Sequence, residues 1–154
     1  MVTSNLSKSL KELLQGDDTY GPVAHEEVDA AESKLGIRFP LSYRTFLIHF
    51  GASVGHPSIA GLPNTRSTDK ETPYFENILD LVAQVKRIDG DNIPNSYIPF
   101  SDDGAELKFY FDVGSIDSQG ECSIVALGPG VSTVVAHSLD TFIQRFKNVS
   151  LEIV

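Results

Sequence analysis

The chain has 154 residues, 41% of them hydrophobic, and its 21 acidic and 12 basic side chains give a net charge of −9. This length suits a single globular domain, and the acidic balance argues against nucleic acid or an anionic membrane as a binding partner. One cysteine, Cys122, allows no internal disulfide, and no signal peptide or membrane-spanning run is recognisable, so we expect a cytoplasmic protein.

Two helices are expected before residue 36, because apolar residues recur there at helical spacing. The first lies within residues 1–16 and has four leucines on one face: Leu6, Leu10, Leu13 and Leu14. The second begins near Ala24 and should end at Gly36, since glycine readily adopts the left-handed conformation that closes a helix.

A third helix should follow directly, because Pro40 presets the backbone of a first helical turn. Four large apolar residues share one face of it and should enter the core: Tyr43, Phe46, Leu47 and Phe50. Residues 51–77 are rich in glycine, proline, serine and threonine and predict mostly loop, with "HPSIAGL" (56–62) as the one plausible short strand.

A fourth helix is expected in "ENILDLVAQVKRI" (76–88), with an inward stripe at helical spacing: Ile78, Leu81, Val82, Val85 and Ile88. The period then changes to that of strands in "SYIPF", "ELKFYFDV", "CSIVALG" and "STVVAHS". "GPG" at 128–130 predicts a hairpin between the last two strands. "SLDTFIQRF" predicts a closing helix with Ser138 as its N-cap.

This order predicts an α+β fold: an antiparallel sheet meander with helices packed on one face and helices at both termini. Alternation along "LKFYFDV" sends Leu107, Phe109 and Phe111 to one face and Lys108, Tyr110 and Asp112 to the other. We expect the second face to be solvated.

The acidic helix and the hinge after it carry a pattern, Leu-Gly-x-x-x-Pro-x-x-Tyr-x-x-Phe-Leu, that resembles the opening of the SUKH superfamily. The matching residues are Glu27, Glu32, Leu35, Gly36, Pro40, Tyr43, Phe46 and Leu47. Gly51, "YIPFSDDG" and "VVAHSLDTFI" are further similarities, so the resemblance extends over 24–146 and implies one SUKH-like domain in residues 1–154. The superfamily includes regulators of yeast cell-wall assembly and many bacterial immunity proteins.

No residue pattern indicates a metal, a cofactor or a catalytic centre. The four histidines, at 25, 49, 56 and 137, lack the spacing of a zinc site, and His49, His56 and His137 are expected at the surface. Cys122 begins a strand with no helix N-terminus to activate it, so an inert thiol is expected. "SDDG" at 101–104 lacks the downstream glutamate of a calcium loop and predicts a turn with solvated carboxylates.

Acidic residues concentrate between positions 89 and 121, where only Lys108 is basic. We expect loops between the strands to gather them into a patch that steers a basic protein partner. The predicted partner-binding acids are Asp89, Asp91, Asp102, Asp103, Glu106, Asp112, Asp117 and Glu121. Tyr97 and Tyr110 are predicted as exposed aromatic anchors, because tyrosine is favoured at binding hot spots.

The resemblance and the charge together favour an immunity protein that is not an enzyme and that neutralises a cognate toxin domain, such as a basic nuclease, by binding it. A regulatory interaction scaffold like the cell-wall regulators is one alternative. A small hydrolase that uses Cys122 or the pair Asp102 and Asp103 is another. The sequence leaves the oligomeric state open.

Overall fold

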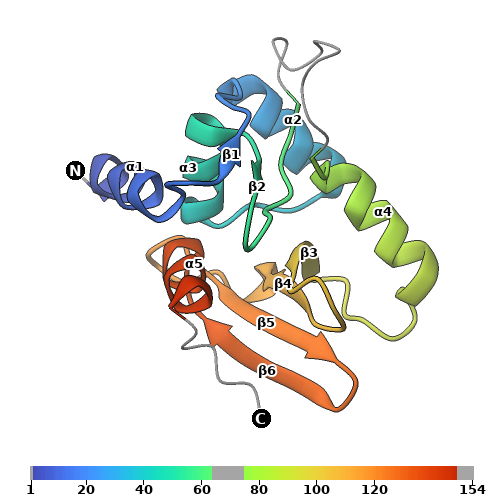
Figure 1. Ribbon diagram of the computed structural model, residues 1–154. Coiled ribbons are helices and arrows are strands. Elements are labelled where there is room, and N and C mark those ends of the chain that lie inside the picture. The colour runs from blue at the N-terminus through green and yellow to red at the C-terminus, as the bar shows by residue number, and fades with distance from the viewer. Residues whose placement is uncertain (1, 64–74, 149–154) are drawn as a thin grey trace.

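The computed structural model describes residues 2–63 and 75–148, with side chains from residue 5 (Figure 1). The elements in chain order are α1 (Val2–Leu13), β1 (Asp18–Thr19), α2 (His25–Leu35), α3 (Leu41–Phe50), β2 (Ser53–Val54), α4 (Ile78–Asp89), β3 (Tyr97–Asp102), β4 (Lys108–Asp112), the 3-10 turn η1 (Val113–Ser115), β5 (Ser123–Gly128), β6 (Val131–Ala136) and α5 (Leu139–Lys147). The predicted α+β class is therefore confirmed.

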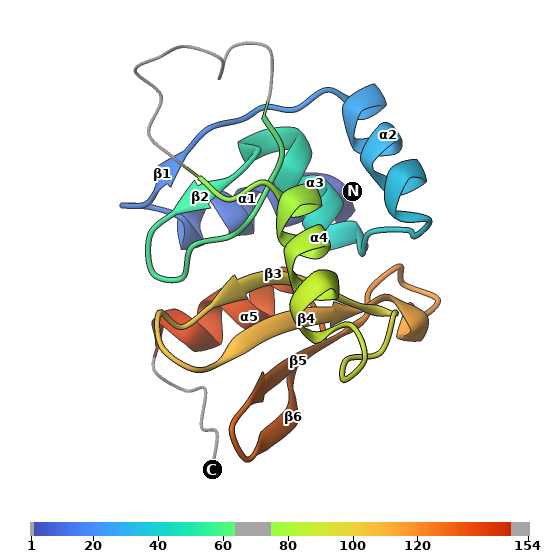
Figure 2. The same cartoon turned by 90° about the vertical axis from the view of Figure 1, so that its right-hand side faces the viewer.

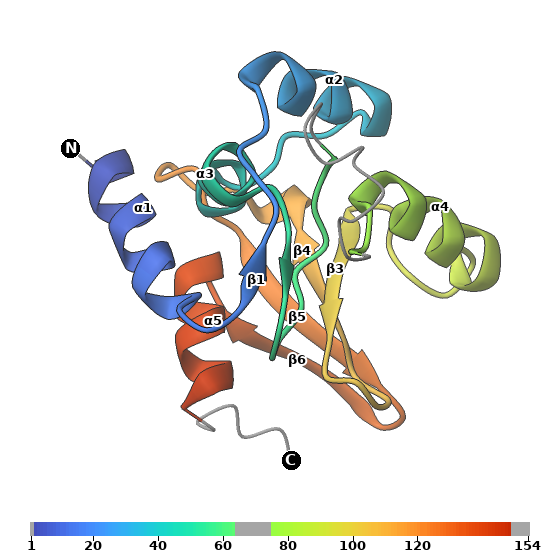
Figure 3. The ribbon, with the colours of Figure 1, turned by 45° about the horizontal axis from the view of Figure 1, so that its top comes forward.

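The main sheet is an antiparallel meander in the order β3-β4-β5-β6, so each strand pairs with its neighbour in sequence. The α1, α2 and α3 helices form a layer over one face of this sheet, and α4 runs along its β3 side (Figures 1 and 2). The β3–β4 and β5–β6 turns lie at the same end of the sheet (Figure 3). Gly128 pairs with Val131 across the second of these turns, as the "GPG" signal predicts.

Aromatic rings from the helices and the sheet meet in the core. Phe100 of β3 stacks on Phe111 of β4 at 3.9 Å between ring centroids, and Phe142 of α5 lies edge-on to Phe100 at 5.3 Å. From α3, Tyr43 packs against Phe111 at 4.9 Å. Its buried hydroxyl donates a hydrogen bond of 2.6 Å to the carbonyl oxygen of Ala60, so this tyrosine satisfies its one polar atom inside the core.

The predicted helix boundaries hold where they depend on local chemistry. Gly36 closes α2 in the left-handed conformation, with φ +67°. The side chain of Ser138 accepts a hydrogen bond from the backbone N–H of Thr141 at the start of α5. Pro40 takes the N-cap position of α3 in an extended conformation, one residue before the helical position that its ring would also suit.

The strand predicted at 56–62 is wrong. Instead β2 (53–54) pairs with β1 (18–19) in a separate two-stranded sheet, and Ile59 forms only a single bridge to Ser53. Two-residue strands are too short to show alternation, so the sequence pattern cannot reveal them. The close backbone approach here needs glycine, because a Cβ on Gly61 would collide with the carbonyl oxygen of Gly51.

The inward stripe predicted for α4 is also partly wrong. Ile78, Val82 and Val85 are buried, but Ile88 is 64% exposed. Helical spacing places a residue on a face of the helix and carries no information on how far the neighbouring element extends beside it. Among the described residues, no helix is both long and apolar enough to cross a bilayer.

Candidate partner-binding surface

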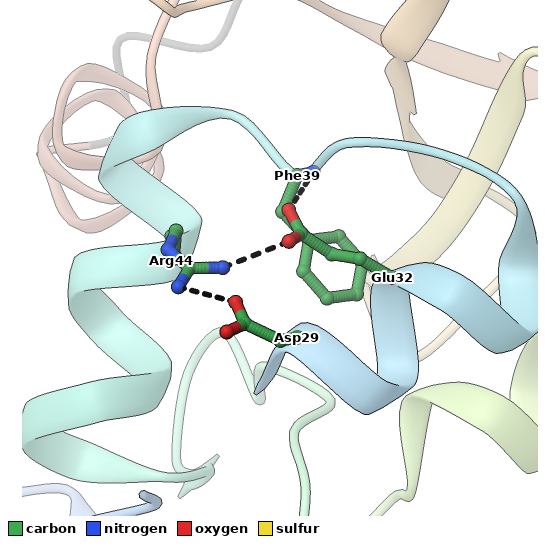
Figure 4. A network of polar contacts seen from close by, with 4 residues as sticks. All are labelled: Asp29, Glu32, Phe39 and Arg44. Carbon is green, nitrogen blue, oxygen red and sulfur yellow. Dashed lines mark hydrogen bonds and ion pairs between the residues drawn. The ribbon is translucent and has the colours of Figure 1, made fainter. Parts of the chain in front are cut away.

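The hinge that carries the motif is held by a network of charged groups (Figure 4). Arg44 of α3 reaches back to α2, where its two terminal nitrogens lie 2.7 Å from Asp29 Oδ1 and 2.8 Å from Glu32 Oε1. Glu32 Oε2 also accepts a hydrogen bond of 2.8 Å from the backbone N–H of Phe39. One glutamate thus fixes both the incoming loop and the next helix, so its role is to hold the hinge.

A cavity of about 560 Å³ opens beside this network, between α2, the hinge and the β4–β5 loop. Its lining includes Arg38, Arg44 and Asp117. Arg44 and both of its carboxylate partners already bind one another. This arrangement supports a structural role for the hinge groups, because their hydrogen-bonding capacity is used within the fold.

A second polar junction joins the β4–β5 loop to two helices. Glu121 accepts hydrogen bonds from the backbone N–H of Ser42 at 3.0 Å and from its hydroxyl at 2.7 Å. The Ser42 hydroxyl accepts in turn from the backbone N–H of Leu139 at the start of α5. Burial raises the pKa of Glu121, and the Ser42 hydrogen bonds oppose that rise only in part. The sequence gives no sign of this contact, which spans 79 residues.

The predicted turn at 101–104 is present, and its carboxylates have a local task. Asp102 Oδ1 accepts from the N–H of Gly104 at 2.7 Å, and Asp103 Oδ1 accepts from those of Ala105 and Leu107 at 2.9 and 3.1 Å. Each aspartate therefore holds its own turn through one oxygen. Both side chains lie at the surface, Asp102 exposed and Asp103 half-buried.

Two more of the predicted acids hold turns at the other end of the sheet. Asp112 Oδ1 accepts from Gly114 at 3.2 Å, and Asp117 Oδ1 accepts from Gln119 at 2.9 Å and Glu121 at 3.1 Å. The expectation of one continuous acidic patch is thus wrong. Asp102 of β3 pairs with Lys108 of β4, and Asp112 lies four residues after Lys108 on the same strand, where it pairs with Tyr97. Four residues of extended strand separate the two ends by about 14 Å.

The acids therefore form two groups. The β3–β4 turn group contains Asp102, Asp103 and Glu106. The opposite group contains Asp89 at the end of α4, Asp91 just after it, Asp112, Asp117 and Glu121. None of these eight residues forms an ion pair with any described residue, whereas the hinge acids and Asp17 do. Their charge is thus left without a basic partner in the part of the chain that the structure describes.

Tyr110 was predicted as an exposed anchor, and this is wrong: only 2% of it is exposed. Its ring lies 6.0 Å from that of Tyr97, which is half-buried. Burial raises the pKa of the Tyr110 hydroxyl, and nearby Asp89 adds to the rise. Alternation correctly placed Tyr110 opposite the core face, but it could not show that this part of the second face is covered.

Cys122 is 3% exposed, and burial raises its pKa to about 12. A thiol with this pKa is fully protonated at neutral pH and is a poor nucleophile. His49, His56 and His137 are exposed, as expected. Within residues 2–63 and 75–148, no group of three or more metal-ligating side chains is assembled. The described residues thus give the hydrolase alternative no support at Cys122.

A smaller cavity of about 240 Å³ lies between β2, residues 58–60 and the end of β3. Its lining includes Ser53, whose buried hydroxyl has no hydrogen-bond partner among the described residues. Ser101, on the same lining, uses its hydroxyl to donate 2.6 Å to the carbonyl oxygen of Ser58. The described lining also includes the carboxylates of Glu76 and Asp102 but no histidine, lysine or cysteine, so it lacks the usual base for a serine nucleophile.

Comparison with known proteins shows the family of the chain. The model of the SMI1 / KNR4 family (SUKH-1) matches residues 22–145. The match begins just before α2 and ends in α5, so it includes the hinge, the whole four-stranded sheet and both polar junctions. A search of curated protein sequences finds no significant match. The family match covers most of the 154 residues, and the chain belongs to the SMI1 / KNR4 family (SUKH-1).

Proposed function

We propose that this chain is an immunity protein that binds a cognate bacterial toxin domain with a basic surface and neutralises it without catalysis. Membership of the SUKH-1 family supports a domain that acts through a protein partner. A nuclease is the favoured toxin class, because its active site must be basic to hold phosphates.

The observation that carries the proposal is the set of unpaired acids between positions 89 and 121. Eight carboxylates lie in loops or at the ends of strands and of α4, and none forms an ion pair with a described residue. Several are held in place by backbone N–H groups, as at Asp102, Asp103 and Asp117. Charges that are already ordered lose little conformational entropy on binding, which favours their use in a protein interface.

The direct test is growth protection. A candidate toxin domain, sought first in the reading frames next to the gene for this chain, is expressed with and without the chain, and survival is counted. We expect protection, together with a stable complex when an inactivated toxin domain is mixed with the purified protein. Full toxicity in the presence of soluble, folded protein would overturn the proposal.

A matched pair of variants separates charge from turn structure. Asp102→Asn with Asp103→Asn keeps an acceptor oxygen for each turn hydrogen bond and removes two charges. We expect weaker protection with an unchanged melting temperature. Asp29→Asn, which removes a charge at the hinge far from this turn in sequence, serves as the control and should protect as the wild type does.

A further inference from the structure

We propose that the cavity between β2, residues 58–60 and the end of β3 binds the side chain of one lysine from a protein partner. This inference rests on the proposed function, because it names a place that would hold part of the partner's basic surface. The alkyl chain of the lysine lies against the apolar part of the lining, and its ammonium group meets two carboxylates and a buried hydroxyl.

Backbone hydrogen bonds hold the walls of this cavity in place. Ser53 and Ile59 exchange two of them, at 3.1 and 2.9 Å, and the N–H of Ala60 donates 2.8 Å to the carbonyl oxygen of Phe100 in β3. The cavity has a volume of about 240 Å³, whereas one ordered water needs only about 10–15 Å³ of such space. It is therefore formed before a ligand enters and has room for a side chain.

The hydroxyl of Ser53 is the observation that points to a ligand. Ser53 lines the cavity and is 1% exposed, and its Oγ has no hydrogen-bond partner among the described residues. The other two serines on the lining use their hydroxyls within the fold, since Ser101 donates to the carbonyl oxygen of Ser58 and Ser58 to that of Gly55. A buried hydroxyl without a partner is unfavourable, so a ligand that reaches Ser53 makes a bond that the fold leaves unmade.

The charges on the lining select a cation. Glu76 and Asp102 are the two charged residues of the described lining, and neither forms an ion pair with a described residue. Glu76 is fixed beside the cavity, because its carbonyl oxygen accepts a hydrogen bond of 2.8 Å from the N–H of Gly61. Lys108 is the cross-strand neighbour of Asp102 but is not part of the described lining. An anion would meet two negative charges here and no positive one.

The apolar part of the lining favours lysine over a smaller cation. It consists of aliphatic and aromatic side chains that can cover an alkyl chain: Val54, Ile59, Phe75, Leu81 and Phe100. Lysine combines a four-carbon stem with an ammonium group that has three donors, and the lining offers three acceptor groups in Ser53, Glu76 and Asp102. Nucleic acid and anionic lipid have the wrong sign, and a second copy of this chain would add a net charge of −9. The occupant is therefore a lysine on a basic protein.

Two small probes test the cavity without the natural partner. N-acetyl-lysine N-methylamide carries the ammonium group, and N-acetyl-norleucine N-methylamide has a similar side chain without it. The full chain, labelled with nitrogen-15, is titrated with each probe by NMR at low salt. We expect the lysine probe to shift the amide signals of Ser53, Leu81 and Ser101, and the norleucine probe to bind at least about fivefold more weakly. Shifts centred away from the cavity, or equal binding of the two probes, would overturn the inference.

Three variants locate the ammonium group. Ser53→Ala removes the unpartnered hydroxyl and Glu76→Gln removes one charge, and each should weaken binding of the lysine probe about two- to tenfold. Glu106→Gln is the control, because it removes the same charge from an exposed residue of the β3–β4 turn that is not on the described lining. It should change the binding less than about twofold. Equal effects of Glu76→Gln and Glu106→Gln, or unchanged binding in Ser53→Ala, would contradict the site.

The melting temperature of Ser53→Ala checks that weaker binding is not a loss of folding. It should be no lower than that of the wild type, because the hydroxyl that is removed makes no hydrogen bond with a described residue.

The same variants separate this inference from the proposed function. If the wild type neutralises the toxin while Ser53→Ala and Glu76→Gln protect equally well, the lysine site is wrong and the function stands. If the lysine probe binds the cavity as expected and the toxin is not neutralised, the immunity role is wrong and the site for a lysine side chain stands.

Discussion

Replacing Phe46 by alanine should remove a large part of the free energy of unfolding of this domain. Phe46 is fully buried in α3, with its ring centroid 5.9 Å from that of Tyr43 and 6.1 Å from that of Phe50. Truncation removes the ring and leaves a cavity, which costs about 3–5 kcal/mol in well-packed cores. For a chain of this length, each kcal/mol lowers the melting temperature by about 2–4 °C, so a fall of roughly 6–20 °C is expected.

Thermal denaturation followed by circular dichroism measures this loss, and urea denaturation gives the free energy of unfolding. Phe50→Ala is the matched control, because Phe50 lies one turn further along the same helix and is only partly buried. Its loss should be clearly smaller. An unchanged melting temperature for Phe46→Ala together with lost partner binding would show that Phe46 belongs to an interface and that the core assignment is wrong.

Three other outcomes follow from the polar groups. Cys122→Ala should protect cells as the wild type does, because burial raises the pKa of the thiol to about 12 and makes it a poor nucleophile. A folded variant that fails to protect would support the hydrolase alternative instead. Glu121 has a pKa raised above its ordinary 4.5, so the folded state binds its proton more tightly than the unfolded state does. The wild type should therefore lose stability relative to Glu121→Gln as pH rises above 4.5, and urea denaturation showing the opposite slope would contradict the burial of this carboxylate. Asp103→Ala should lower the free energy of unfolding by about 1 kcal/mol in the same assay, because two N–H groups lose their acceptor. Asp103→Asn keeps an acceptor oxygen and should lower it less. Equal losses in the two variants would show that the turn does not need this oxygen.

Features with a local physical cause were predictable from the sequence. Gly36 ends α2 because of its own backbone freedom, and Ser138 begins α5 through its own hydroxyl. The meander followed from strands separated by short turns, which pair with their sequence neighbours. Periodicity was sufficient for these elements because each carries its signal within about ten residues.

Features that depend on distant residues were not predictable. Burial of Tyr110 depends on what covers the second face, and the pairing of β1 with β2 joins strands that are two residues long. The hydrogen bond from Ser42 to Glu121 joins α3 to the β4–β5 loop, 79 residues further along the chain. The division of the acidic residues between the two ends of the sheet also could not be predicted, because it depends on the register of β3 and β4.

The most direct test of the central claim is the rate at which the protein associates with an inactivated cognate toxin domain, measured by stopped flow over a range of salt concentrations. Electrostatic steering predicts that the wild-type rate falls steeply as salt screens the acids, within its roughly 10–1000-fold range. It also predicts that a variant with Asp102, Asp103 and Asp112 all changed to Asn associates more slowly, with a weaker salt dependence and a similar dissociation rate. A folded triple variant with the wild-type association rate and salt dependence would contradict the claim that these carboxylates guide a basic partner.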